Sequence, residues 1–84
     1  MKRKLFSGRL EYDHLRDRWF LQNYDGEVVW LNSGDSVDIG SVYNCALRAV
    51  LSRVGTSWMW NLPVIPSPRV GLSASIWLQD DAAA

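Results

Sequence analysis

Alternation of apolar and polar residues with a period of two is the feature that most restricts how this chain can fold. The clearest example, GLSASIWL, sets Leu72, Ala74, Ile76 and Leu78 against Ser73, Ser75 and Trp77. Successive side chains of a strand point to opposite faces, so this pattern is typical of a strand with one buried face. We therefore expect a strand near the end of the chain, with Trp77 directed away from the core.

Two further alternating segments flank the polar stretch DHLRD in the first third of the chain. The first of them, LFSGRLEYD, places four residues on one face: Phe6, Gly8, Leu10 and Tyr12. The second, RWFLQNY, places Trp19 and Leu21 opposite Phe20. We expect two strands here, paired antiparallel across DHLRD.

Asp25-Gly26 in YDGEVVWL is the strongest turn signal. A two-residue hairpin turn needs positive φ at both central positions, and these residue types adopt it at low cost. The dipeptide therefore predicts that the preceding strand folds directly back into EVVWL. In that strand Val29 and Leu31 would face inward and Trp30 outward.

The middle of the chain is interpreted as further strands. After the loop NSGDS, VDI begins a fourth strand. GSVYNCALRAVLSRVG fits a helical stripe as well as a strand, and the choice for residues 41–50 stays open. We favour a strand over residues 46–54, because VGTSW then makes a compact turn into WMWNL. Trp58, Trp60 and Leu62 share one face of that hairpin, which predicts that both tryptophans pack in the core.

Six to seven short strands at intervals of about ten residues, separated by turn signals, predict an all-β fold. We expect a small SH3-like barrel or a closely related partly open barrel of antiparallel strands, because closure removes exposed sheet edges. The 84 residues suit one domain, with an ordered core over residues 5–78 and a frayed tail at residues 79–84.

Composition predicts a folded, soluble protein. Apolar residues make up 48% of the chain and charged residues 21%, which is ordinary for a globular domain. Cys45 is the single cysteine, so we interpret it as a buried apolar side chain in a reduced, cytoplasmic setting. No apolar stretch approaches the roughly 18 to 20 residues of a membrane-spanning helix, so no membrane partner is expected.

The order of several short motifs resembles a known family. LNSGDSVDI, followed by RAVL, SWMWNL and GLSASI, is similar to the L-x-x-G-D-x-V-x-I opening and G-L-x-V-x-I closing strand of SH3-like small barrels. With GRLEYD and RWFL, residues 8–78 resemble a small all-β domain family of mobile elements in Gram-positive gut bacteria. The resemblance is carried by Gly34, Asp35, Val37, Ile39, Arg48, Trp58, Gly71 and Leu72.

That family has no agreed activity, so the resemblance implies a fold and a setting. The setting is a small phage or plasmid accessory protein. The role that we expect from it is inhibition of a host nuclease defence such as CRISPR–Cas, with a Cas-type nuclease as the candidate partner.

Catalytic motifs are absent from the sequence: no phosphate-binding loop, zinc-finger spacing or nucleophile elbow occurs. In YDHLRD, Asp13, His14 and Asp17 could offer ligands to a metal, completed by Cys45. The spacing favours a different interpretation, a solvated loop whose aspartates hydrogen-bond to their own backbone. We therefore expect a protein that is not an enzyme and that carries no cofactor or metal.

Three large aromatic residues are expected on outward faces: Phe20, Trp30 and Trp77. Flanked by Arg18, they would form a partner-binding patch, because Trp, Tyr and Arg dominate binding hot spots. The alternative is that the N-terminal hairpin or a second copy of the protein covers these rings. On the first interpretation the protein binds a host protein through this patch.

A nucleic-acid-binding accessory module is the competing hypothesis. MKRK, Arg9, Arg16 and Arg18 could meet phosphates while exposed rings stack on bases. Against it, nine basic and nine acidic residues give a net charge of zero, whereas strong nucleic-acid binders are basic overall. The basic N-terminus is then interpreted as unstructured and solubilising.

Overall fold

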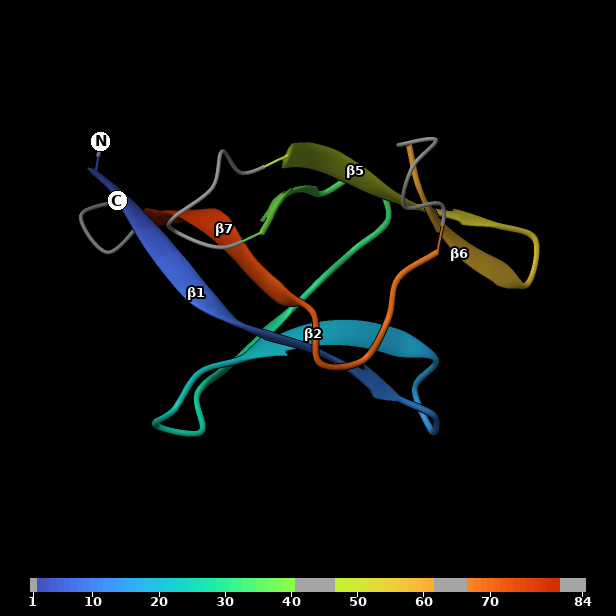
Figure 1. The fold of residues 1–84 in the computed structure, drawn as a ribbon, viewed down its shortest axis with the longest axis horizontal. Helices are drawn as coiled ribbons and strands as arrows, with labels where there is room; N and C mark the ends of the chain where they lie inside the picture. Colours follow the sequence, from blue (N-terminus) through green and yellow to red (C-terminus); the bar gives the residue numbers. More distant parts are fainter. Residues whose placement is uncertain (1, 41–46, 62–66, 81–84) are drawn as a thin grey trace.

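The computed structural model describes residues 2–40, 47–61 and 67–80. Seven antiparallel strands form a single sheet in the order β3-β2-β1-β7-β4-β5-β6 (Figure 1). The strands are β1 (Lys2–Asp13), β2 (Arg18–Gln22), β3 (Val28–Trp30), β4 (Ser36–Ile39), β5 (Leu47–Val54), β6 (Ser57–Trp60) and β7 (Ser73–Asp80). The prediction of an all-β fold with six to seven short antiparallel strands is confirmed. The sheet is not closed into a barrel, because β3 and β6 lie at its two ends.

The sheet curls because two of its long strands, β1 and β5, change partners along their length. β1 pairs with β7 over residues 2–9 and with β2 over residues 9–13. β5 likewise pairs with β4 over residues 47–50 and with β6 over residues 51–54. The half of the sheet that contains β2 therefore lies opposite the half that contains β5 (Figure 1).

Gly8 lies where β1 passes from one partner to the other. A Cβ atom at this position would come within 2.5 Å of the Gln22 carbonyl oxygen, closer than real Cβ contacts. Because glycine has no Cβ, the backbone of β1 can approach β2 closely at the bend.

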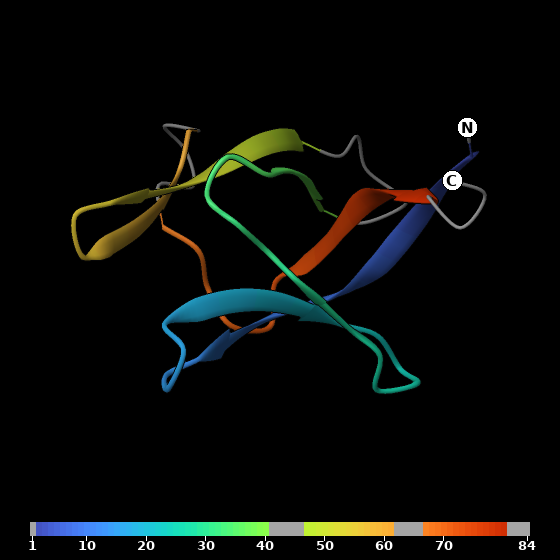
Figure 2. The same cartoon turned by 180° about the vertical axis from the view of Figure 1, so that it is seen from behind.

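The segment that follows β3 ties the two halves together (Figure 2). The Leu31 N–H donates to the Trp19 carbonyl on β2 (2.9 Å). Further along, the Gly34 N–H donates to the Leu51 carbonyl on β5 (2.6 Å), and the Leu51 N–H donates to the Asp35 carbonyl (2.9 Å). Residues 31–35 thus connect β2 to β5 through main-chain hydrogen bonds.

The core lies between the two halves and consists of the inward faces that alternation predicted. Twelve described apolar residues are buried: Phe6, Leu10, Trp19, Leu21, Leu31, Val37, Ile39, Ala49, Leu51, Trp60, Ala74 and Ile76. Trp58 is half-buried against this cluster, so the prediction that both tryptophans of WMW pack in the core is confirmed. Leu62 lies outside the described residues.

The connection between β2 and β3 differs from the expected two-residue turn. It is a loop of five residues, 23–27, closed by the Asn23 N–H donating to the Glu27 carbonyl (3.1 Å). The Asn23 side-chain oxygen accepts the main-chain N–H groups of Asp25 (3.0 Å) and Glu27 (2.9 Å). Within this loop only Gly26 adopts positive φ, at 84°. The predicted two-residue turn is therefore wrong, because Asn23 organises a wider loop.

The strands extend further toward both ends of the chain than expected. β1 begins at Lys2 and β7 ends at Asp80, and these two residues pair. The expected boundaries at residues 5 and 78 are corrected by this pairing, and residues 2–4 lie in a strand and not in an unstructured segment. The strand expected over residues 46–54 is confirmed for Leu47–Val54; residues 41–46 lie outside the described part. No helix in the described part is long and apolar enough to cross a membrane.

Candidate functional site

An aromatic pair lies on the outer face of β2 and β3. Phe20 and Trp30 are directly opposite each other in the strand register, and their ring centres are 5.0 Å apart at an angle of 53°. Their neighbours Trp19 and Leu21 point into the core, so alternation directs both rings outward. Trp30 keeps 36% of its surface exposed.

Two arginines flank the Trp30 ring. The guanidinium carbons of Arg16 and Arg18 each lie 5.4 Å from its centre, within the range of a cation–π interaction. The Arg18 guanidinium donates to the Asn32 side-chain oxygen (2.6 Å) and to the Leu31 carbonyl (3.4 Å). We call Arg16, Arg18, Phe20 and Trp30 the aromatic patch. Sequence reasoning did not place Arg16 there, because its position depends on the turn between β1 and β2.

Asp13 fixes Arg16 and the turn that carries it. The Asp13 carboxylate accepts the main-chain N–H groups of Leu15 (2.9 Å) and Arg16 (3.2 Å) and forms an ion pair with the Arg16 guanidinium (2.7 Å). The hydrogen bond from the Arg16 side chain, with those from the backbone, lowers the pKa of Asp13 below its usual 3.8. The aspartate therefore hydrogen-bonds to its own loop, as the sequence suggested.

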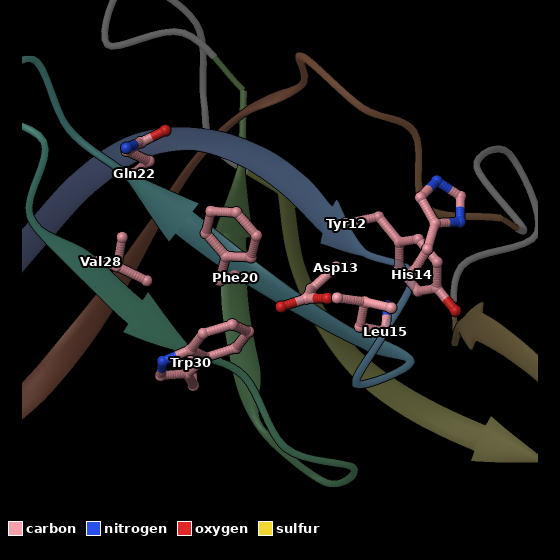
Figure 3. Close-up of a pocket in the computed structure, with 8 residues that line it drawn as sticks. All are labelled: Tyr12, Asp13, His14, Leu15, Phe20, Gln22, Val28 and Trp30. Carbon is pink, nitrogen blue, oxygen red and sulfur yellow. The ribbon is translucent and has the colours of Figure 1, made fainter.

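A shallow hollow of about 540 Å³ adjoins the patch (Figure 3). Phe20, Val28 and Trp30 form one side, and the turn after β1 forms the other. The complete lining is Tyr12, Asp13, His14, Leu15, Phe20, Gln22, Val28 and Trp30. Leu15 is 96% exposed and adds apolar surface at the edge of this hollow.

Asp17 anchors the same turn to the opposite half of the sheet. Its carboxylate accepts hydrogen bonds from the Tyr12 hydroxyl and from the Trp58 indole N–H (3.2 Å), and it forms an ion pair with Arg53. The hydrogen bond from Tyr12 is the largest influence lowering the pKa of Asp17, and the same bond raises the pKa of Tyr12. Asp17 adopts a left-handed backbone with φ of 51°, which this set of contacts stabilises.

Trp77 lies on the same outer face but at a distance from the patch. It pairs with Leu5 on β1, whereas Phe20 pairs with Glu11. Six residues along β1 correspond to about 20 Å. The structure therefore brings Arg18, Phe20 and Trp30 together and places Trp77, 45% exposed, near the other end of β1.

The described residues that the sequence offered as metal ligands each contact a different neighbour. Asp13 faces Arg16 and Asp17 faces Arg53, while the His14 ring packs edge-on against Tyr12 at 4.8 Å. Among the described residues no group of three or more His, Cys, Asp or Glu side chains could hold a metal ion. Cys45 lies outside those residues.

Comparison of the chain with protein-family models, with curated proteins and with solved structures found no match. The function is therefore argued from the aromatic patch itself.

Proposed function

We propose that this protein acts without catalysis, by binding a host protein through the aromatic patch. The observation that carries the proposal is the arrangement around Trp30. A half-exposed indole lies beside Phe20 and two guanidinium groups, at the rim of an open hollow. Tryptophan and arginine in contact are the residue types that contribute most binding energy at protein interfaces.

The surroundings of the patch suit a protein partner. Exposed Leu15 and half-exposed Val28 extend the apolar surface. Asn32 and Asp13 hold the two arginines in place, so binding costs less side-chain entropy than it would for unconstrained arginines. An apolar centre with a polar rim is the usual arrangement of such interfaces.

The setting that we propose follows from the motif resemblance. LNSGDSVDI and GLSASI resemble segments of an SH3-like family of mobile elements, which supports a phage or plasmid accessory protein acting in the host cytoplasm. On this proposal the partner is a component of a nuclease defence, such as a Cas-type nuclease, and binding inhibits it.

A nucleic-acid-binding accessory module is the second candidate, and the cations beside Trp30 are the observation that favours it. Arg16 and Arg18 could meet phosphates while Trp30 stacks on a base. The charge balance favours a protein instead. Arg16 is already neutralised by Asp13, and Glu11 lies opposite Phe20 on the same face.

Affinity capture from a host lysate tests the first candidate, with bound proteins identified by mass spectrometry. We expect Trp30→Ala to lose the captured protein while Trp77→Ala retains it, because both are exposed outer-face tryptophans and only Trp30 belongs to the patch. Capture lost with Trp77→Ala and retained with Trp30→Ala would contradict the proposal.

Titration with fluorescent single-stranded DNA and RNA separates the two candidates. The protein-binding proposal predicts no saturable binding at physiological salt. Binding that requires Trp30 and weakens steeply between 50 and 200 mM salt would favour the nucleic-acid module.

A further inference from the structure

A second pocket, separate from the aromatic patch, lies where β1 passes from β7 to β2. Its volume is about 710 Å³, within the range of small-molecule binding sites. The strands contribute these polar residues to its lining: Ser7 and Arg9 from β1, Gln22 from β2, and Ser73 and Ser75 from β7. Among the described residues that line the pocket, none is acidic.

The strand register brings these polar side chains together on the outer face of the sheet. Arg9 is directly opposite Gln22 on β2 and Ser73 on β7. Two residues along β1, Ser7 is opposite Ser75, and their hydroxyl oxygens are 2.8 Å apart. Because one of these hydroxyls donates to the other, the pair keeps a second O–H that can donate to a ligand.

Arg9 is the only charged residue among the described residues that line the pocket. Within the described part of the chain, its guanidinium forms none of the ion pairs found. Acidic residues near the pocket do not line it: Asp38 is paired with Arg48 (3.1 Å), and Glu27 accepts a hydrogen bond from the β2–β3 loop (3.2 Å). Glu11 follows Arg9 on the same face of β1, and it too lies outside the lining. The pocket therefore has a positive charge that the fold leaves available.

We propose that this pocket binds a small molecule that carries a phosphate group. The Arg9 guanidinium can donate two parallel N–H groups to phosphate oxygens, which is the strongest form of such recognition. The serine hydroxyls and the Gln22 amide add neutral donors from β1, β2 and β7. A phosphate group presents three terminal acceptor oxygens and can accept from all of these strands at once.

The single cation favours a small ligand over a nucleic acid. Binding along a nucleic-acid backbone needs several cations that follow successive phosphates, whereas this pocket offers Arg9 among its described lining residues. None of the residues of the aromatic patch lines the pocket, so this inference does not rest on the proposed function. Phosphate binding without partner capture, or capture without phosphate binding, would separate the two.

NMR titration of the ¹⁵N-labelled protein tests the proposal, with ribose 5-phosphate, inorganic phosphate and ribose as ligands. We expect saturable shifts around Arg9 with ribose 5-phosphate, at a Kd of about 1 mM or below, and none with ribose. Tighter binding of ribose 5-phosphate than of inorganic phosphate would assign a phosphate ester as the ligand, and equal binding would assign free phosphate. No saturable shift with either phosphate compound up to about 20 mM, or an equal response to ribose, would overturn the proposal.

Substitution of Arg9 tests whether the pocket itself binds the phosphate. Arg9→Gln should weaken binding of ribose 5-phosphate by about tenfold or more, because the charged donor is lost. Arg69→Gln is the matched control: it makes the same change of charge at an exposed residue outside the lining, and Kd should stay within about twofold of the wild type. Equal losses in the two variants would show that overall charge attracts the phosphate, and would overturn the assignment of this pocket.

A second variant tests the hydroxyl pair without a change of charge. Ser75→Ala removes one hydroxyl of the pair and should weaken binding of ribose 5-phosphate by about two- to fivefold. Circular dichroism and the unfolding midpoint check that each variant is folded. An unchanged Kd in both Ser75→Ala and Arg9→Gln would overturn the proposal.

Discussion

At the scale of single residues, two side-chain properties decide how the candidate site is built. The absence of a side chain at Gly8 lets β1 bend past β2. The carboxylate of Asp17 joins the turn that carries Arg16 to the opposite half of the sheet through Tyr12, Trp58 and Arg53. Alternation placed Gly8 on the inward face, but the need for glycine there depends on a backbone contact with Gln22, which is far away in sequence.

Gly8→Ala should lower the free energy of unfolding by about 1–3 kcal/mol, because its new methyl group would overlap the Gln22 backbone. Urea unfolding followed by tryptophan fluorescence measures the change. Gly26→Asn is the control: that position has φ of 84° and no atom within 4 Å of an added Cβ, and asparagine tolerates this backbone. Equal stability of Gly8→Ala and the wild type would contradict the close approach.

Acidic pH should loosen the turn between β1 and β2. The pKa values of Asp13 and Asp17 are lowered in the folded protein, so their contribution to stability is present above their usual pKa of 3.8 and is lost as pH falls through the folded values. Thermal unfolding between pH 7 and pH 2 should show a decline in Tm that begins near pH 4. Asp17→Asn should flatten that decline; an unchanged acid profile would contradict the role of Asp17.

Alkaline pH should also lower the stability of the fold, here because Tyr12 loses its proton. The pKa of Tyr12 is raised above its usual 10.0, chiefly by the hydrogen bond to Asp17. Its contribution is therefore present below pH 10 and lost as pH rises through the folded value. Tyr12→Phe should remove this alkaline loss, which thermal unfolding between pH 8 and pH 11 would detect.

At the scale of strands and loops, alternation predicted which residues face the core. Leu10, Leu21, Val37 and Ala74 are all buried as their patterns indicated. The loop between β2 and β3 was not predicted, because a side chain, that of Asn23, satisfies the main-chain donors and widens the turn. The partner changes of β1 and β5 were also unpredicted, since they depend on pairings between distant segments.

Asn23→Ala should destabilise the protein by about 1 kcal/mol, because two main-chain N–H groups of the loop lose their acceptor. Tyr24→Ala, in the same loop but fully exposed, is the matched control and should leave stability within about 0.5 kcal/mol of the wild type. Thermal and urea unfolding of both variants measure the difference. Equal losses in the two variants would show that Asn23 does not organise the loop.

At the scale of the whole molecule, the candidate site is defined by how strands are ordered in the sheet. Outward directions for Phe20, Trp30 and Trp77 could be predicted from alternation alone. Their grouping could not, because it depends on which residue of β1 lies beside each ring: Glu11 beside Phe20, but Leu5 beside Trp77. The curl of the sheet then leaves the patch and its hollow on the outside of β2 and β3 (Figure 3).

Titration of the captured partner with purified variants tests the central claim most directly. We expect Trp30→Ala to weaken binding by about thirtyfold or more, as the loss of a hot-spot residue does, and Trp77→Ala to leave Kd within about threefold of the wild type. Both variants must unfold with a midpoint close to that of the wild type, which shows that they are folded. An unchanged Kd for Trp30→Ala would contradict the assignment of the aromatic patch as the binding surface.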